Sequence, residues 1–466
     1  MTSCLNLSGT LMVVGGGVTG RSVLGLLRSF DNPLIVVDDN PTVRQQCEAL
    51  QPGRIRGLSV EEAGEALDGV DLVITSPGWR PDTPLFRRAE EKQVDVIGDV
   101  ELAWRLDQSG AFGEPRRWLG VTGTNGKSTT TAMLAAMMRR VDPRALAVGN
   151  IGMAVTEALQ SPERVNTLVV ELSSFQLHWC STLAPEAGVY LNLAEDHLDW
   201  HGGFRAYAMD KTKVLAAHKA FAGVDDENLR TLLRSEQLLD GVTGFTAGEP
   251  EPGQVGVRGG MIVDRTGAED VELAPIEGID PPGPAGVLDA LAAAAMAYHC
   301  GVPPEDIAAA LADFHVAGHR GQVVADIDGI RAIDNSKATN PHAADAALAG
   351  VENILWFAGG QLKGADVHEL IAKHASRMKA AFVLGIDRQE IVDALQTLAP
   401  EVRVVSTEST DPEQAMRDLV LASREIARPG DTLVLAPAAA SLDMYRGMGH
   451  RGDIFTETVR SIYSRS

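Results

Sequence analysis

The sequence contains few cysteines, and those it has form no motif. Only four occur in 466 residues, and no two of them stand in a Cys-x-x-Cys pair. They are Cys4, Cys47, Cys180 and Cys300. This scatter excludes the spacing of a cysteine zinc site and of a disulfide framework. We therefore expect reduced thiols, as in a protein of a reducing compartment.

Basic charge and long apolar runs are also scarce. The 41 Lys and Arg residues are outnumbered by 63 Asp and Glu residues, which gives a net charge of −22. Nucleic-acid binding needs basic patches, so this balance argues against a nucleic-acid partner. No apolar run reaches the ~18 residues of a membrane span, and no basic segment precedes the first apolar run. We expect a cytoplasmic protein without a membrane partner.

The length and the alternation of segments predict three α/β domains. Apolar β-rich runs alternate with helical patterns throughout, which is typical of doubly wound parallel sheets. The domains that we expect are a Rossmann-like domain over 1–108, a central P-loop ATPase-type domain over 109–316, and a C-terminal Rossmann-like domain over 317–466. Residues 287–300 predict a long helix, and the Gly- and Pro-rich stretch 246–286 predicts loops or short strands.

A first glycine loop follows the strand predicted at 10–15. Its residues Gly15, Gly17 and Gly20 satisfy G-x-G-x-x-G, and Asp38 ends the next predicted strand. This arrangement is typical of a dinucleotide site, with Asp38 on a ribose, in about one case of two. The alternatives are a tight turn without a ligand and a site for another nucleotide, because a helix N-terminus attracts any diphosphate.

A second glycine loop, "GVTGTNGKST", occupies 120–129. It is not a strict Walker A loop, because Val121 stands where that pattern needs glycine. Its chemistry is the same: glycines expose N–H groups to phosphate, Lys127 neutralises charge, and Ser128 can bind Mg²⁺. The alternative is a glycine turn without a ligand, which such a sequence would represent in roughly one case of ten.

Acidic residues follow two further predicted strands. Glu171 ends the run "LVVEL", where it predicts either a Mg²⁺ ligand or a helix cap. The run "LNLAEDHLDWH" concentrates acidic and histidine residues, which indicates metal or acid–base chemistry or simply a solvated loop. Its candidates are Glu195, Asp196, His197, Asp199 and His201. By spacing alone, Lys211 reads as an exposed helical lysine.

Six motifs in order identify a resemblance to a known family. They are "TGTNGKST", "ELSSFQL", "NLAEDHLDWH", "AGHR", "DNSKATN" and "APAAASLD", and they extend over essentially the whole chain. Together they resemble the Mur ligase family. "TGTNGK" alone would also fit folylpolyglutamate synthetases, whereas "ELSSFQL", "DNSKATN" and "SLD" favour the glutamate-adding member. In that family the first loop holds the UDP of the substrate and the second holds ATP.

The resemblance implies ATP-driven amide formation. The carboxylate of UDP-N-acetylmuramoyl-L-alanine attacks ATP to give an acyl phosphate, and the amine of D-glutamate then displaces phosphate. The implied cofactors are ATP, two Mg²⁺ ions and a CO₂-derived carbamate on Lys211. A monomer is expected, acting on these small molecules during cytoplasmic peptidoglycan precursor synthesis.

The resemblance also assigns residues to each ligand. For ATP these are Gly123, Thr124, Asn125, Gly126, Lys127, Ser128, Thr129, Arg320 and Asn335. For metal they are Ser128, Glu171, His197 and Lys211, and for the UDP substrate Val18, Thr19, Ser76, Asn150, Ser173 and Gln176. For glutamate they are Lys337, Thr339, Lys363 and Ser441, and the catalytic set is Lys127, His197 and Lys211.

The sequence departs from the family pattern at a few positions. Ala285 and Gly286 replace a His-Asn pair near the adenine, Asn335 replaces an aspartate, and Met448 replaces a phenylalanine. Three other functions stay open at this point. They are an NAD-dependent dehydrogenase based on the first loop, a noncatalytic nucleotide-binding regulator, and a related ligase that adds another amino acid or L-glutamate.

Overall fold

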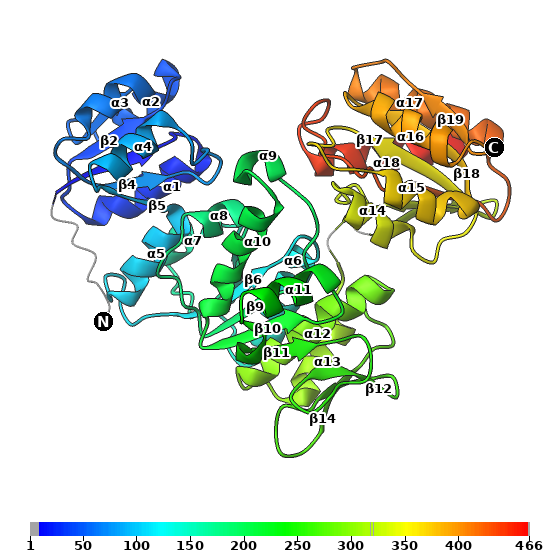
Figure 1. Cartoon of the computed structure of the whole chain (residues 1–466), viewed down its shortest axis with the longest axis horizontal. Coiled ribbons are helices and arrows are strands. Elements are labelled where there is room, and N and C mark those ends of the chain that lie inside the picture. The colour runs from blue at the N-terminus through cyan, green and yellow to red at the C-terminus, as the bar shows by residue number, and fades with distance from the viewer. Residues whose placement is uncertain (1–8, 317, 320, 465–466) are drawn as a thin grey trace. The chain divides into compact units, whose positions relative to one another are not determined.

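The computed structural model describes residues 9–316, 318–319 and 321–464, which form two compact units (Figure 1). The first unit comprises the described residues up to Leu193 together with Arg205–Ile279 and Gly286–Phe314. The second comprises Ala194–Phe204, Asp280–Ala285 and the described residues from His315 onward. Each unit is described by itself below.

The first sheet has five parallel strands in the order β3-β2-β1-β4-β5. These are β1 (Thr10–Val14), β2 (Leu34–Val37), β3 (Ile55–Leu58), β4 (Val70–Thr75) and β5 (Asp95–Gly98). The helices are α1 (Val18–Leu26), α2 (Pro41–Leu50), α3 (Val60–Ala66), α4 (Pro84–Glu91) and α5 (Asp99–Gln108), with a 3-10 turn at Leu27–Ser29. All four residues of β2 are buried, as a strand covered by helices on both faces requires.

The second sheet has nine strands in the order β14-β13-β12-β11-β10-β9-β6-β8-β7. These are β6 (Arg117–Thr122), β7 (Ala145–Gly149), β8 (Thr167–Glu171), β9 (Ala187–Tyr190), β10 (Lys219–Gly223), β11 (Val242–Phe245), β12 (Val255–Arg258), β13 (Met261–Asp264) and β14 (Val271–Pro275). Its long helices, α6 (Lys127–Met138) and α12 (Pro284–His299), contribute to one hydrophobic core. The alanine-rich sequence of α12 lets the middle of that helix pack tightly, and Ala290–Ala297 are all buried.

Shorter helices complete this part of the chain. They are α7 (Val155–Leu159), α8 (Ser174–His178), α9 (Leu198–His201), α10 (Phe204–Thr212), α11 (Glu227–Ser235) and α13 (Pro304–Ala312), with 3-10 turns at Lys213–Ala216 and Leu239–Gly241. α9 lies in the segment that groups with the second unit.

The third sheet has six strands in the order β15-β16-β20-β17-β18-β19. These are β15 (Gln322–Ile327), β16 (Ile330–Asp334), β17 (Ile354–Gly359), β18 (Met378–Leu384), β19 (Arg403–Ser406) and β20 (Thr432–Leu435). The helices are α14 (Pro341–Leu348), α15 (His368–His374), α16 (Arg388–Leu398), α17 (Pro412–Ile426) and α18 (Met448–Tyr463), with a 3-10 turn at Ala375–Arg377. Two hydrophobic clusters draw on the same strands, as expected of a doubly wound sheet.

The predicted α/β class with three sheets is confirmed, but the sheets are not wholly parallel. β12, β13 and β14 pair antiparallel within the stretch predicted as loops or short strands, and β15 pairs antiparallel with β16. Short turns such as Gly259–Gly260, both with positive φ, allow this hairpin pairing where no crossover helix is available. The domain boundaries at 108/109 and 316/317 remain predictions.

Three of the four cysteines lie in the part of the chain that the structure describes. Cys47, Cys180 and Cys300 are free thiols, and Cys4 lies outside the described residues. Within the described part of the chain, the search for a helix long and apolar enough to span a bilayer finds none.

Hydrogen bonds connect the first two sheets within the first unit. Glu101 of α5 is fully buried and accepts hydrogen bonds from the backbone and hydroxyl groups of Ser181 and Thr182. The Ser22 and Thr156 hydroxyls lie 2.5 Å apart. The two glycine loops therefore belong to sheets that are joined by buried polar contacts.

A buried ion pair fixes the amino end of β6. Asp107 is fully buried and accepts from the Arg116 guanidinium at 2.5 Å, the Arg116 N–H at 2.9 Å and the Trp118 indole at 2.8 Å.

Removal of one partner leaves a buried charge uncompensated, so Asp107→Ala should lower the free energy of unfolding by about 3–5 kcal/mol. Differential scanning calorimetry tests this. The control Asp68→Ala removes an exposed ion pair with Lys92 and should cost less than about 1 kcal/mol. Equal losses in the two variants would refute the expectation.

Candidate functional site

The second glycine loop lies between β6 and α6, as predicted. Asn192, which follows β9, holds it from outside: its backbone carbonyl accepts from Thr124 N–H at 3.0 Å, and its side chain pairs with the Asn125 backbone at 2.9 and 3.1 Å. The Tyr207 hydroxyl lies 3.0 Å from the Thr124 hydroxyl. Sequence reasoning missed Asn192 and Tyr207 because their role depends on neighbouring strands and helices.

Gly126 and Lys127 begin α6. Gly126 has φ +80°, and a Cβ there would lie 2.1 Å from the Asp289 carboxylate, so no other residue fits this turn. Lys127 Nζ donates to the carbonyl oxygens of Gly123 at 3.0 Å and Thr124 at 2.8 Å. The lysine ammonium is thus held at the loop, and the N–H groups of the helix N-terminus lie beside it. This combination suits an anionic phosphate.

Glu171 ends β8, which pairs with β6 so that Glu171 is in register with Val121. Its side chain is buried: Oε1 accepts from Asn150 Nδ2 at 2.8 Å, while Oε2 has no hydrogen-bond partner among the described residues. A buried carboxylate oxygen without a donor is costly. A hard divalent cation would satisfy it, so the donor set at this edge fits the Mg²⁺ that the resemblance implies.

Lys211 lies on α10 and is not the exposed lysine that its spacing suggests. It is 2 % exposed, and its Nζ donates to the carbonyl oxygen of Gly123 at 2.7 Å. The ammonium also lies 4.9 Å from the Tyr207 ring centroid. Lys127 and Lys211 therefore share one acceptor, the Gly123 carbonyl. Two cations at one acceptor repel each other, so this site favours an anion.

His197 lies in the segment Ala194–Phe204, which groups with the second unit. It has a positive φ of 53° and lies 3.5 Å from the Asp196 carboxylate, which in turn accepts from Asn340 Nδ2 at 3.4 Å. Its predicted convergence with Lys211, which belongs to the first unit, therefore stays a prediction.

The first glycine loop borders a cavity of about 730 Å³. Val18, Thr19 and Ser76, which the resemblance assigns to the UDP substrate, line it together with Asp38 and Trp79. Val18 is 76 % exposed, so an apolar surface faces the cavity.

Close packing explains the glycines of this loop. A Cβ on Gly15 would lie 2.8 Å from both Ser76 Oγ and Trp79 Nε1, and one on Gly20 would lie 1.8 Å from the Gly15 carbonyl. The Asp38 carboxylate accepts from the N–H groups of Gly16 at 3.0 Å and Asn40 at 2.9 Å. Asp38 thus has a structural role in the loop, which explains its position without a dinucleotide.

Ser173 and Gln176 form a capping box at the start of α8. Ser173 Oγ accepts from Gln176 N–H at 3.1 Å, and Gln176 Oε1 accepts from Ser173 N–H at 3.0 Å. Gln176 also hydrogen-bonds the buried Asp99 at the start of α5, whose Oδ1 has no partner among the described residues. These two predicted substrate residues are therefore fixed by the helix cap and by a carboxyl group that sequence reasoning missed.

The buried Asp99 should make stability depend on pH. Burial raises its pKa from 3.8 to about 6, so the folded protein holds this proton more tightly than the unfolded chain does. Its contribution to stability is full below pH 4 and is lost as the pH rises through about 6, by about 3 kcal/mol. Asp99→Asn cannot ionise. It should raise the melting temperature relative to wild type at pH 7.5 and not at pH 4, and a variant no more stable than wild type at pH 7.5 would contradict this.

The residues predicted to bind the substrate glutamate follow three adjacent parallel strands of the third sheet. Lys337 and Thr339 follow β16, Lys363 follows β17, and Ser441 follows β20. Because the order is β16-β20-β17, the loops meet at one edge of the sheet. The backbone of Gln361 pairs with that of Ala440 at 2.8 and 2.9 Å, which joins two of these loops. Asn335 lies at the same edge, whereas Arg320 lies outside the described residues.

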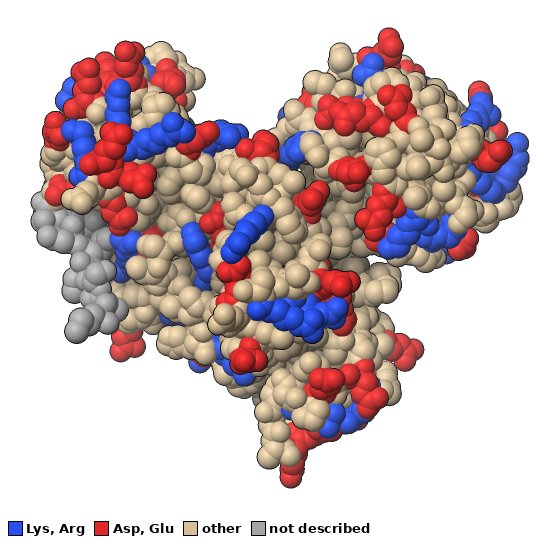
Figure 2. Space-filling model, in the orientation of Figure 1, with Lys and Arg blue, Asp and Glu red and all other residues tan. Residues whose placement is uncertain are grey.

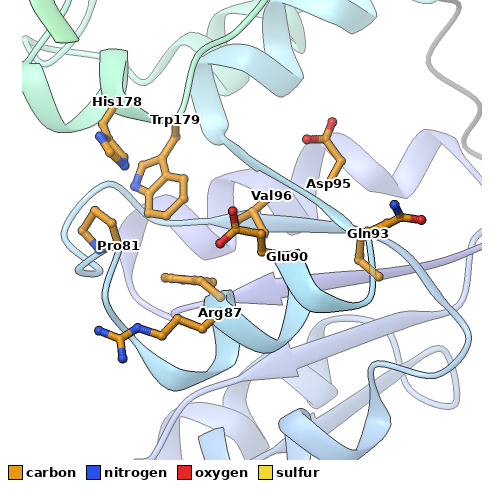
Figure 3. Close-up of a pocket in the computed structure, with 10 residues that line it drawn as sticks. Pro81, Arg87, Glu90, Gln93, Asp95, Val96, His178 and Trp179 are labelled. Atoms are coloured by element: carbon orange, nitrogen blue, oxygen red, sulfur yellow. The ribbon is translucent and has the colours of Figure 1, made fainter. Parts of the chain in front are cut away.

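A further hollow of about 520 Å³ lies between α4, β5 and the end of α8 (Figure 3). Its lining includes Pro81, Arg87 and Glu90 from one side and His178 and Trp179 from the other. The Phe86 and Trp179 rings pack edge to face with centroids 5.0 Å apart. Since no predicted site residue lines it, this hollow marks the packing between the first two sheets.

Charges of both signs mix on the surface. On the face shown in Figure 2, Lys and Arg side chains are interspersed with Asp and Glu on each unit.

Comparison with protein-family models gives matches in all three parts of the chain. The MurD-like N-terminal domain of Mur ligases matches residues 9–98, the Mur ligase middle domain 121–249, and the Mur ligase glutamate ligase domain 319–439.

Two curated relatives match nearly the full length. The chain is 57 % identical over 456 residues to UDP-N-acetylmuramoylalanine--D-glutamate ligase of Corynebacterium efficiens, which covers 98 % of this chain and 95 % of that protein. It is 46 % identical over 477 residues to the protein of the same name from Mycobacterium avium, with 97 % and 96 % covered.

Solved structures show the same fold at low identity. MurF from Acinetobacter baumannii has a TM-score of 0.60 at 15 % identity and covers 97 % of this chain and 93 % of that one. UDP-N-acetylmuramate-alanine ligase MurC from Thermotoga maritima has a TM-score of 0.55 at 20 % identity, with 97 % and 99 % covered. With family models that match from residue 9 to 439 and curated relatives of nearly equal length, the chain belongs to the Mur ligase family of ATP-dependent ligases.

Proposed function

We propose that this enzyme adds D-glutamate to UDP-N-acetylmuramoyl-L-alanine at the expense of ATP, through an acyl phosphate, in peptidoglycan precursor synthesis. The observation that carries this proposal is the pair of lysines, Lys127 and Lys211, that share the Gly123 carbonyl at the phosphate loop. The names of the two bacterial relatives support the choice of substrates. We propose further that the enzyme is a cytoplasmic monomer.

The chain's own groups supply the chemistry of the first step. The N–H groups at the start of α6 and the Lys127 ammonium bind the β- and γ-phosphates and stabilise the charge that develops on the transferred phosphoryl group. The substrate carboxylate attacks the γ-phosphorus and the bond to ADP breaks, which creates the leaving group that amide formation needs. Thr124 and Asn125 belong to the same loop, and Ser128 and Thr129 belong to the first turn of α6.

Two groups absent from the polypeptide complete this site in our proposal. Mg²⁺, held by Ser128 and Glu171 and by His197 with the modified Lys211, would neutralise phosphate charge. A carbamate on Lys211 would turn a cation into an oxygen ligand. The carbamate forms when the neutral amine of this buried lysine adds CO₂ and releases a proton.

The remaining predicted residues bind the other two substrates. Val18, Thr19 and Ser76 border the cavity that we assign to UDP, and Asn150 orients Glu171. At the edge of the third sheet, Lys337 and Lys363 match the two carboxylates of glutamate, while Thr339 and Ser441 offer hydroxyl groups. Arg320 and Asn335 are assigned to ATP by the resemblance.

Interception of the acyl phosphate tests this mechanism. Hydroxylamine added in place of glutamate should yield the hydroxamate of UDP-N-acetylmuramoyl-L-alanine, detected by mass spectrometry, only when ATP is present. Formation of the hydroxamate without ATP, or release of AMP in place of ADP, would refute the acyl phosphate intermediate.

A further inference from the structure

One arginine of the second unit is buried at the edge of the third sheet, where the residues predicted to bind the substrate glutamate meet. Arg451 belongs to the first turns of α18 and is 1 % exposed. Its Nε donates to Ser336 Oγ at 3.0 Å and its Nη2 to the Ser336 carbonyl at 2.9 Å. Its Nη1 donates to the carbonyls of Gly359 at 3.2 Å and Ala439 at 3.1 Å.

The charge of Arg451 is not neutralised by an ion pair. Among the described residues no ion pair to its guanidinium is found, although the Asp443 and Asp334 carboxylates lie near enough to favour the charged form. Burial lowers the pKa of Arg451 to about 10, so the group is still a cation at neutral pH. The start of a helix is also an unfavourable place for a cation. A buried charge in such surroundings costs several kcal/mol, and an apolar side chain would fill the space at lower cost.

The three acceptors of Arg451 stand at the beginnings of three loops. Ser336 directly precedes Lys337, and Ala439 precedes Ser441 by two residues. Gly359 ends β17 and begins the loop to Lys363, and both Gly359 and Gly360 have positive φ, of 113° and 135°. The guanidinium thus contacts the chain where β16, β17 and β20 end.

We propose that Arg451 is a positioning residue of the amino-acid pocket, whose guanidinium sets the spacing of the three loops that present Lys337 with Thr339, Lys363 and Ser441. This inference rests on the proposed assignment of that edge to D-glutamate. It extends the assignment by naming the group that assembles the pocket.

The shape of the guanidinium is what this role requires. Its planar group offers five N–H donors in fixed directions. It donates four hydrogen bonds here: two to the hydroxyl and carbonyl of Ser336, and two to the carbonyls of Gly359 and Ala439. A lysine ammonium has the same charge but only three donors on a single nitrogen atom, so it cannot replace the four hydrogen bonds that Arg451 donates from three nitrogen atoms. The buried charge also adds positive potential at a pocket for a dicarboxylate.

Arg451→Lys tests the proposal because it keeps the charge and removes the planar group. We expect the KM for D-glutamate to rise at least tenfold, while the KM for UDP-N-acetylmuramoyl-L-alanine changes less than twofold. The matched control is Arg116→Lys, which changes a buried arginine that also donates to backbone carbonyls but lies in the first unit beside Asp107. It should lower the melting temperature and leave both KM values unchanged.

A second variant keeps the test decisive if Arg451→Lys does not fold. Ser336→Ala removes only the hydroxyl that accepts from Arg451 Nε and donates to the Met448 carbonyl at 2.7 Å. It should raise the KM for D-glutamate about threefold or more, again without effect on the UDP substrate. A KM for D-glutamate within twofold of wild type in every folded variant would overturn the positioning role. Wild-type enzyme that fails to use D-glutamate would instead overturn the proposed function.

Discussion

Lys127→Ala should reduce ATP-dependent phosphate release by at least about 10³-fold while the protein stays folded. The Lys127 ammonium donates to two carbonyls of the phosphate loop, so it is held where the phosphates would bind. Its interaction strengthens as charge develops on the transferred group, and loss of one such donor costs about 10²–10³ in rate in comparable sites. Removal of the full positive charge of Lys127 should lower the rate by at least the same factor.

A matched control separates this effect from a general loss of lysine. Lys219→Ala removes a half-buried lysine at the amino end of β10, at the edge of the same sheet opposite the phosphate loop. It should keep near-normal turnover. Circular dichroism and the melting temperature report folding in both variants. Turnover within tenfold of wild type in folded Lys127→Ala would remove Lys127 from the catalytic set.

The second large effect concerns Lys211. If its amine carries a carbamate, Lys211→Ala should lose at least about 100-fold in activity, and a short-chain carboxylate such as acetate should restore part of it by filling the vacated space. Lys211→Arg should be inactive and should not be rescued, because a guanidinium keeps the positive charge beside Lys127. Steady-state phosphate release with 0–100-fold molar excess of acetate over substrate measures the rescue.

A direct readout accompanies the rescue. Wild-type protein equilibrated with ¹³C-bicarbonate should give a carbamate carbon signal by NMR, and Lys211→Ala should lose it. The buried position of Lys211, at 2 % exposure, predicts a single slowly exchanging signal. Full activity of Lys211→Arg would show that a simple cation suffices at this position, and the same signal in Lys211→Ala would show that the carbamate is not on Lys211.

Features set by local sequence were predictable. The strand–loop–helix order around Gly126 and Lys127 follows from a buried apolar run, glycines and a helix former, and the structure places β6 and α6 there. The helix α12 was also predictable, because its long apolar run is typical of a buried helix. The family resemblance added the ligand assignments, which periodicity alone could not supply.

Features set by contacts between distant segments were not predictable. Asn192, Asp99 and Arg451 are ordinary residues in sequence, and their roles arise from a strand neighbour, a helix cap and a set of loop carbonyls. The reading of Lys211 from helical spacing was wrong for the same reason, because spacing does not show which face another sheet covers. The hairpins β12–β14 lie in a Gly- and Pro-rich stretch that gives only a weak periodic signal.

The proposed reaction joins D-glutamate to UDP-N-acetylmuramoyl-L-alanine at the expense of ATP. Its most direct test is the rate of phosphate release with that UDP substrate and ATP, compared among D-glutamate, L-glutamate and meso-diaminopimelate, with the product identified by mass spectrometry. We predict rapid release and a product one glutamyl residue heavier with D-glutamate alone. Equal or faster ligation of L-glutamate or meso-diaminopimelate would contradict the assignment of D-glutamate as the added amino acid.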